Sequence, residues 1–198
     1  MIQQHGVMRG ASNLNEYELL RIASRVAELL EKSKLKVVFA ESCTAGRIAA
    51  TLSKVPGISA SLCGSFVTYR NDSKNQWLGV RGDDLSSPKI GPVSESVARQ
   101  MAIGALNRTP EADVAVSITG HLGPNAPEVL DGIAYSAICF REGTSGITKL
   151  DQVNCIQLDQ EMTIQNKQST LREERQASAV AFVLNQLVLN LESKISNR

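Results

Sequence analysis

Ser42 is the side chain whose position best suits nucleophilic chemistry. It follows the apolar stretch 36–40, which is typical of a strand, and precedes a segment with helical spacing from Thr44 to about Lys54. At such a junction a hydroxyl is exposed, and the first helical N–H groups, near Thr44 to Gly46, lack partners and point to the same space. Those groups suit the oxyanion of an acyl transfer. Position alone favours a second interpretation, in which Ser42 or Thr44 is simply the helix N-cap.

Tyr69 and Lys74 offer a way to activate a serine without a histidine. Both lie just after an apolar strand. A lysine that burial or a nearby cation keeps neutral can take the serine proton, and a tyrosine can relay it. Arg70 would favour a neutral Lys74 if it lay close. The alternative is that Tyr69 completes the core and Lys74 is a solvated loop residue.

Cys43 is a third candidate nucleophile, because a thiolate is intrinsically more reactive than a hydroxyl and a helix N-terminus lowers the pKa of a thiol. The chain has two histidines, and a Cys–His pair would use His121. The four cysteines form no C-x-x-C pair. We therefore expect reduced thiols in a reducing compartment.

Two further segments suit an anionic ligand. Thr119 and Gly120 open a loop rich in glycine and proline after an apolar strand, and its backbone N–H groups are free to meet an anion. Arg172 and Arg175, just before the last helix, could pair a phosphate in bidentate fashion. The alternative is that these arginines are solvated or neutralise the glutamates between them. No carboxylate and histidine cluster has metal-ligand spacing, so neither a metal nor another cofactor is expected.

Composition indicates one ordinary globular domain. The chain has 198 residues, of which 42% are hydrophobic and 21% charged, and its formal net charge is +1. That balance gives no global field to attract nucleic acid or an anionic membrane. The first residues do not resemble a signal peptide, and no apolar run is long enough to span a bilayer. We expect a cytoplasmic protein, and a homodimer would fit a compact α/β enzyme.

Alternating helical and strand patterns predict an α/β fold, a single-domain three-layer α/β/α sandwich with a mostly parallel, mixed sheet. Strands are expected at 36–40, 66–69, 114–118, 132–140 and about 148–158. Helices are expected at about 13–30, 44–54, 92–106 and 177–191, with Ser94 as an N-cap. A hairpin turn at 143–146 makes the sheet mixed. The domain is predicted at 13–196, after a flexible tail at 1–12.

Together these segments resemble the C-terminal domain of the competence-damage-inducible protein CinA, the family of nicotinamide-nucleotide amidases. The order and spacing of the motifs match over about residues 15–190, and the block Glu-Ser-Cys-Thr is the most distinctive of them. The matching stretches are 40–46, 56–60, 64–69, 74, 78–80, 91–95, 118–120 and 123–124.

The resemblance implies hydrolysis of the carboxamide of nicotinamide mononucleotide, without a metal, to nicotinic acid mononucleotide and ammonia. It makes Ser42 the nucleophile of a serine acyl-enzyme, with Tyr69 and Lys74 handling its proton. The partner is then a small pyridine nucleotide. The residues that would shape the pocket and its amide donors are Thr44, Gly46, Thr119 and Gly120.

The chain departs from the family pattern in two places. Ala45 stands where the family usually has a second glycine, and the loop 121–132 has lost glycines and gained Asp131. Lost glycines remove positive-φ freedom, and an aspartate facing the pocket would disfavour an anionic ligand. These changes favour an alternative, a non-catalytic or altered-specificity nucleotide-binding relative. We also expect the chain to lack the separate N-terminal domain of full-length members, and with it any pyrophosphatase activity.

Overall fold

The computed structural model describes residues 8–9, 15–142, 147–158 and 170–196. A mixed sheet lies at the centre, with the strand order β1-β6-β5-β4-β2-β3. Its strands are β1 (Met8–Arg9), β2 (Val37–Glu41), β3 (Leu62–Val67), β4 (Val114–Gly120), β5 (Ile133–Glu142) and β6 (Ile147–Gln157). β2 runs parallel to β3 and β4, and β1 parallel to β6, whereas β5 is antiparallel to both β4 and β6. The predicted mixed sheet is confirmed.

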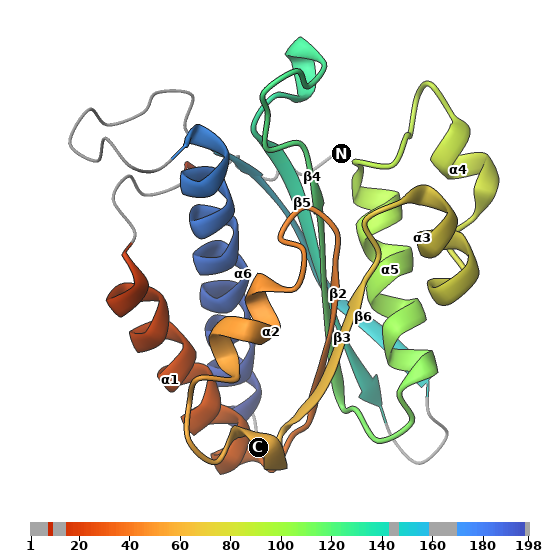
Figure 1. Ribbon diagram of the computed structural model, residues 1–198. Helices are drawn as coiled ribbons and strands as arrows, with labels where there is room; N and C mark the ends of the chain where they lie inside the picture. The colour runs from red at the N-terminus through yellow and green to blue at the C-terminus, as the bar shows by residue number, and fades with distance from the viewer. Residues whose placement is uncertain (1–7, 10–14, 143–146, 159–169, 197–198) are drawn as a thin grey trace.

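Helices cover both faces of this sheet, as predicted for three α/β/α layers (Figure 1). One face carries α1 (Glu16–Ser33), α2 (Arg47–Leu52) and α6 (Leu171–Ser196). The other face carries α3 (Asn71–Leu78), α4 (Gly82–Ser86) and α5 (Glu95–Arg108). Two short 3₁₀ turns, Ile58–Ala60 and Glu128–Leu130, lie in the connections. In the described part of the chain, no helix combines the length and apolar character that crossing a membrane requires.

The central strand β2 explains why the core has two halves. Every residue of β2 is buried, because the strand has neighbours on both sides and helices on both faces. Side chains alternate along a strand, so Val37 and Phe39 join the core beneath α1 and α6, whereas Val38 and Ala40 join the core beneath α5. The last residue of this buried strand, Glu41, is charged.

The parallel register of β2, β3 and β4 brings the candidate residues together. Glu41 lies opposite Val67 of β3 and Ile118 of β4. The residues that follow these strands therefore meet at one edge of the sheet, where ligands of α/β folds commonly bind. They are Ser42 and Tyr69, and beside them lie the last two residues of β4, Thr119 and Gly120.

Several predicted elements needed correction. Met8 and Arg9, placed in a structureless tail, pair with β6. The helix expected from Thr44 begins at Arg47, and Tyr69 lies beyond the end of its strand. The predicted turn at 143–146 lies outside the described residues.

Helices α3 and α4 were not predicted at all. Each is short, and α3 buries Lys74 and Leu78 whereas α4 buries Leu85, so neither has an apolar repeat to detect. A glycine lets α3 approach helix α5 closely. A Cβ on Gly104 of α5 would lie 2.0 Å from the carbonyl oxygen of Leu78. This close contact brings Lys74, on α3, to the same edge as Ser42.

Candidate active site

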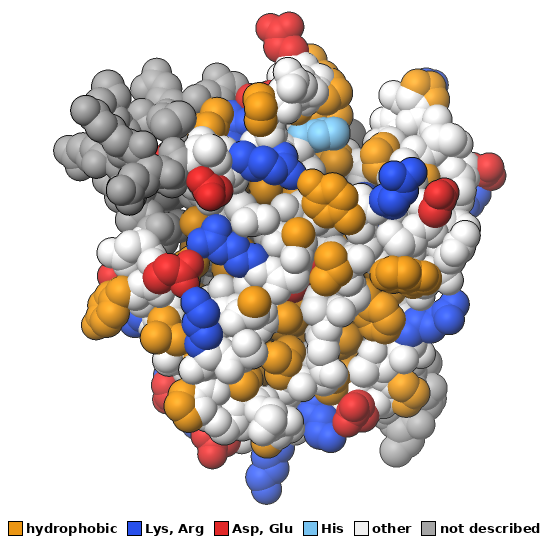
Figure 2. Space-filling model, in the orientation of Figure 1, with side chains coloured by type: hydrophobic (Ala, Val, Ile, Leu, Met, Phe, Trp, Pro, Cys, Tyr) orange, Lys and Arg blue, Asp and Glu red, His pale blue; other side chains and the backbone are white. Residues whose placement is uncertain are grey.

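A pocket of about 270 Å³ opens at this edge of the sheet. Of the residues predicted for the site, six line it: Ser42, Tyr69, Lys74, Thr119, Gly120 and Arg172. Thr44, Gly46 and Arg175 are not among the lining residues. On this face of the molecule, apolar and uncharged side chains cover the centre and Lys and Arg side chains stand on both sides of it (Figure 2).

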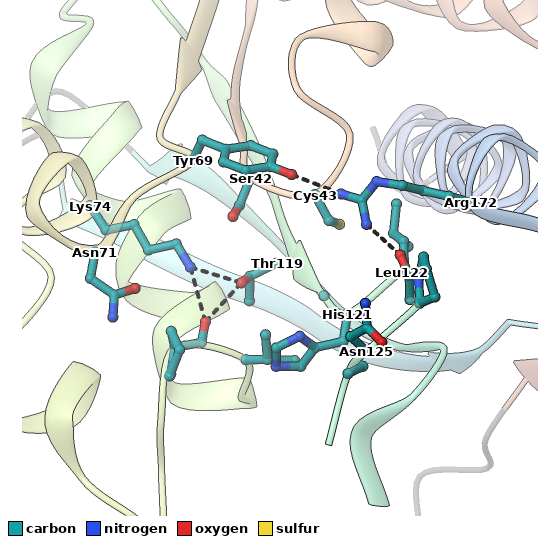
Figure 3. A pocket seen from close by; sticks show the side chains of 16 residues that line it. Ser42, Cys43, Tyr69, Asn71, Lys74, Thr119, His121, Leu122, Asn125 and Arg172 are labelled. Atoms are coloured by element: carbon teal, nitrogen blue, oxygen red, sulfur yellow. Dashed lines mark hydrogen bonds between the residues drawn. The ribbon is translucent and has the colours of Figure 1, made fainter. Parts of the chain in front are cut away.

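Ser42 is held by its backbone and has a free side chain. Its N–H donates to the carbonyl oxygen of Ile118 at 3.0 Å, which extends the pairing of β2 with β4 by one residue. The side chain points into the pocket, below the ring of Tyr69 and toward Lys74 and Thr119 (Figure 3). Its hydroxyl has no hydrogen-bond partner among the described residues. The helix-cap alternative is therefore not what the structure has, because this hydroxyl caps nothing.

Among the described residues, the turn after Ser42 leaves three backbone N–H groups without an acceptor, those of Cys43, Thr44 and Gly46, although not all those predicted are free. The N–H of Ala45 donates to the carbonyl oxygen of Ser42 at 3.1 Å, so it is spent within the turn. The N–H groups of Cys43 and Thr44 donate to no acceptor in the described part of the chain. The side-chain amide of Gln176, on α6, donates to the carbonyl oxygens of Cys43 at 3.4 Å and Thr44 at 3.2 Å. These bonds fix the turn to α6.

Glu41 is the residue of this region that sequence reasoning missed. Its side chain is fully buried and accepts four hydrogen bonds, from the Thr44 hydroxyl at 2.8 Å and from the Ile48 N–H, the Ala49 N–H and the Ser65 hydroxyl at 3.0 Å each. The signal was available in the sequence, since a carboxylate at the end of an apolar strand needs donors nearby. The glutamate lies three residues before Thr44 and six before Arg47, the first residue of α2, and this turn and helix supply three of its four donors.

Two consecutive residues of the turn have positive φ. Ala45 has φ 51° and Gly46 has φ 92°. Glycine adopts this region freely, whereas an alanine there brings its Cβ close to the backbone. A Cβ on Gly46 would also lie 3.3 Å from Cγ2 of Val67, so Gly46 keeps the turn close to β3. The departure at Ala45 is thus accommodated at the cost of backbone strain.

Lys74 is a buried amine with neutral partners. It is 3% exposed, and its Nζ donates to the carbonyl oxygen of Pro92 at 3.1 Å and to the hydroxyl of Thr119 at 3.0 Å. The Thr119 hydroxyl itself donates to Pro92 at 2.8 Å, which closes a triangle (Figure 3). No carboxylate pairs with Lys74 among the described residues.

Burial lowers the pKa of Lys74 to about 8. This is the direction of shift that the predicted activation of Ser42 by a partly neutral lysine requires. The other suggested cause is not found, since Arg70 is exposed and contributes nothing to this shift. The alternative of a solvated loop lysine is wrong, because Lys74 is a helical residue and buried.

Tyr69 and Arg172 form one side of the pocket. Tyr69 is 56% exposed, so it does not complete the core. Its hydroxyl accepts a hydrogen bond from Nη2 of Arg172 at 2.7 Å, and Nη1 of Arg172 donates to the carbonyl oxygen of Gly123 at 2.7 Å. Both acceptors are neutral, and Arg172 has no ion-pair partner within the described ranges. Because it stands in the first turn of α6, its charge also opposes the helix dipole.

Arg175 has a different role from the one predicted. Its side chain is 2% exposed and makes two hydrogen bonds of 2.8 Å to the carboxylate of Asp131. The charge of Asp131 is compensated by Arg175, so Asp131 does not act as the anion-repelling group that the sequence suggested. The neighbouring guanidinium lowers the pKa of Asp131. Gly123 and Gly132 make room for it. A Cβ on Gly123 would lie 2.7 Å from Nη1 of Arg175, and one on Gly132 would lie 3.4 Å from its Cζ.

Cys43 does not have the properties of an activated thiol. It lines the pocket but is buried, and that burial raises the pKa of its thiol to about 12. The effect is opposite to that expected of a helix N-terminus, and the first helical residue lies four positions further on. None of the four cysteines, all of which lie within the described ranges, forms a disulfide.

The loop that departs from the family pattern lines the other side of the pocket. His121, Leu122, Asn125 and Ala126 are among the lining residues. The side chains of His121 and Asn125 have no hydrogen-bond partner within the described residues, and burial lowers the pKa of His121. Within the same ranges, no three His, Cys, Asp or Glu side chains are grouped so as to hold a metal ion.

Comparison with known proteins gives a family match over most of the chain. Residues 19–188 match the family described as the CinA C-terminal domain. The nicotinamide-nucleotide amidohydrolase PncC of Escherichia coli is 38% identical over 138 residues, which are 69% of this chain and 81% of that protein. A CinA-like protein of Chloroherpeton thalassium is 44% identical over 124 residues, 63% of this chain and 28% of that protein. The chain spans 28–30% of the length of several such longer relatives.

Solved structures share the whole architecture. The competence/damage inducible protein CihA from Agrobacterium tumefaciens superposes with a TM-score of 0.71 at 30% identity, covering 92% of this chain and 99% of that one. The competence damage-inducible protein A from Klebsiella pneumoniae gives a TM-score of 0.73 at 26% identity, covering 88% of this chain and 97% of that one.

The strained turn gives a stability prediction. Replacing Ala45 with glycine should raise the free energy of unfolding by about 1 kcal/mol, because glycine removes the cost of the left-handed conformation. Urea unfolding measures the change. The matched control is Ala49→Gly in α2, which should lower stability by about 0.5–1 kcal/mol. A destabilised Ala45→Gly variant would show that the turn is not strained.

Proposed function

This chain belongs to the CinA C-terminal domain family, and we propose that it hydrolyses nicotinamide mononucleotide to nicotinic acid mononucleotide and ammonia. The nicotinamide-nucleotide amidohydrolase among its relatives supports this substrate. The observation that carries the proposal is that one pocket is lined both by Ser42, whose hydroxyl has no partner among the described residues, and by a buried Lys74 that has neutral partners. Four cysteines that form no disulfide fit a cytoplasmic setting for the reaction.

Lys74 is the base in the proposed reaction. A neutral amine has two hydrogens and one lone pair, and the two hydrogens have acceptors in Pro92 and Thr119. The lone pair is then left to accept the proton of Ser42 as its oxygen attacks the carboxamide carbon. Thr119 therefore serves to orient the amine, and the substrate need not touch its hydroxyl.

The free backbone donors beside Ser42 suit the tetrahedral oxyanion that forms when Ser42 attacks. Attack turns the carboxamide oxygen into an oxyanion, and the unspent N–H groups of Cys43 and Thr44 adjoin the nucleophile. The protonated Lys74 then gives its proton to the departing amine, and ammonia leaves. Water attacks the resulting ester while Lys74 takes the water proton. Lys74 then returns this proton to the Ser42 oxygen as the acid product leaves, so both groups are restored.

Arg172 is assigned to the phosphate of the nucleotide. It lines the pocket without an ion-pair partner in the described residues, and a guanidinium binds phosphate well. The hydrogen bond from Arg172 holds the Tyr69 hydroxyl beside the guanidinium, where the phosphate would bind. We therefore give Tyr69 to phosphate binding and leave the proton of Ser42 to Lys74.

The altered loop supports a second candidate function, an amidase for a related ligand. Side chains of His121 and Asn125 line the pocket in the loop that departs from the family pattern, and both have unused donors and acceptors among the described residues. A ligand with further polar groups on its ribose or base would use them. Turnover of such a nucleotide amide in preference to the mononucleotide would favour this candidate.

The first prediction concerns the nucleophile. Ser42→Ala should abolish ammonia release from nicotinamide mononucleotide, a loss of about 10³-fold or more, because no other activated nucleophile lines the described pocket. Coupled detection of ammonia measures it. Cys43→Ala and the exposed Ser53→Ala should stay within a few fold of the wild type. Unchanged release by Ser42→Ala would exclude the acyl-enzyme at this residue.

The second prediction concerns pH. Lys74 must be neutral to accept the proton, so kcat/KM should rise about tenfold per pH unit up to a midpoint near pH 8 and then level off. Rates between pH 6.5 and 9.5 avoid the titration of the substrate phosphate near pH 6. Lys74→Met should lose the activity at every pH. A flat profile over this range would contradict Lys74 as the base.

The third prediction concerns the phosphate. Arg172→Gln should lower kcat/KM for the mononucleotide by about 10–100-fold, the usual effect of losing a charged hydrogen bond, and should hardly change the rate on nicotinamide riboside. Tyr69→Phe should shift the same ratio by less. Arg70→Gln, an exposed arginine nearby, is the control and should change neither rate. An equal loss on both substrates in Arg172→Gln would show that this arginine does not read the phosphate.

A further inference from the structure

Glu41 is a buried carboxylate that the proposed reaction does not consume. It is 0% exposed and has no ion-pair partner among the described residues, so its burial is offset by hydrogen bonds alone. Four donors occupy the four lone-pair sites of its two oxygens. Four donors must be held in place to hydrogen-bond this buried acid completely. Glu41 also directly precedes the proposed nucleophile, Ser42.

Two of these donors, the N–H groups of Ile48 and Ala49, show that the Glu41 side chain caps helix α2 although Glu41 is not its N-cap residue. The N-cap residue of α2 is Gly46, which has no side chain to serve as a cap. The N–H groups that an N-cap side chain normally satisfies are those of the second and third helical residues. Here they belong to Ile48 and Ala49, and both donate to Glu41 at 3.0 Å. The end of β2 is thereby fixed to the start of α2.

The other two donors tie the same carboxylate to the turn and to β3. The Thr44 hydroxyl donates to Oε2 at 2.8 Å, and the Ser65 hydroxyl donates to Oε1 at 3.0 Å. Ser42 and Cys43 thus lie in a short loop whose two ends, Glu41 and Thr44, are bonded to each other. This contact can hold the positive φ of Ala45 and Gly46, which the isolated turn would not favour.

From these contacts we infer that Glu41 is a positioning residue for the reaction, an inference that rests on the proposed function. Its carboxylate fixes the backbone that aims the Ser42 hydroxyl at the pocket and keeps the N–H groups of Cys43 and Thr44 free for the oxyanion. It acts through the turn, since Glu41 is not among the residues that line the pocket.

A positioning role and a purely structural role differ in what they change. A purely structural residue alters the fraction of folded molecules, and each folded molecule then works at the normal rate. A positioning residue alters the rate of each folded molecule, with little change in KM, because substrate contacts elsewhere in the pocket remain. Neither the pH midpoint of Lys74 nor the phosphate preference should move.

The test uses Glu41→Gln and Thr44→Val in the full chain. Glutamine keeps the length of the side chain but places an NH₂ group opposite two of the donors, whereas valine deletes the turn's own hydroxyl and leaves the helix cap intact. We expect kcat on nicotinamide mononucleotide, per folded molecule, to fall about 100-fold in Glu41→Gln and about 10-fold in Thr44→Val. KM should stay within about threefold and the pH midpoint should not shift. Thr51→Val, the same change on α2 away from the site, should leave kcat unchanged.

A second measurement separates this inference from the proposed function. A fluorophosphonate labels an activated serine without needing the carboxamide substrate, and its rate at Ser42 should fall in both variants. If the wild type is labelled but releases no ammonia, the proposed substrate is wrong and the labelling rates still test Glu41. Wild-type kcat and labelling rate in folded Thr44→Val and Glu41→Gln would overturn the inference, as would a wild type that shows neither reaction. If Glu41→Gln does not fold, Thr44→Val decides alone.

Discussion

The buried carboxylate of Glu41 is the constraint on which the site depends. Four hydrogen bonds converge on it from the turn, from α2 and from β3. Without them the start of α2 would have no cap, because Gly46 has no side chain, and the positive φ values of the turn would have little to hold them. The geometry around Ser42 is thus a consequence of satisfying one charge inside the protein.

The two cationic groups of the pocket differ because their surroundings differ. Lys74 is buried among neutral oxygens, and this burial lowers its pKa to about 8, as its proposed role as the base requires. Arg172 instead lines the side of the pocket and donates to the carbonyl oxygen of Gly123 and to the hydroxyl oxygen of Tyr69. Arg175, only three residues along α6, is instead paired with Asp131. The pair compensates the charge of Asp131 in the altered loop, so Arg172 and not Arg175 is the arginine that lines the pocket.

The main elements could be predicted because their apolar residues repeat. Helix α1 and strand β4 could be predicted from such patterns. Ser94 is the N-cap of α5, as predicted. Helix α3 could not be found in this way, because one of its two buried residues is a lysine. The same buried lysine that hid the helix is the base of the proposed reaction, so the failure of the pattern coincides with the functional residue.

The sequence by itself determined the residue types at the site, the α/β class and, through the order of its motifs, the family. Only the tertiary structure decided which of these residues meet. It placed Arg175 against Asp131 and Arg172 in the pocket, although the two arginines look alike in sequence. It also buried Lys74 and Cys43, which moved their pKa values in opposite directions. Burial and hydrogen-bond partners are properties of packed neighbours that lie far apart along the chain, so local residue patterns do not contain them.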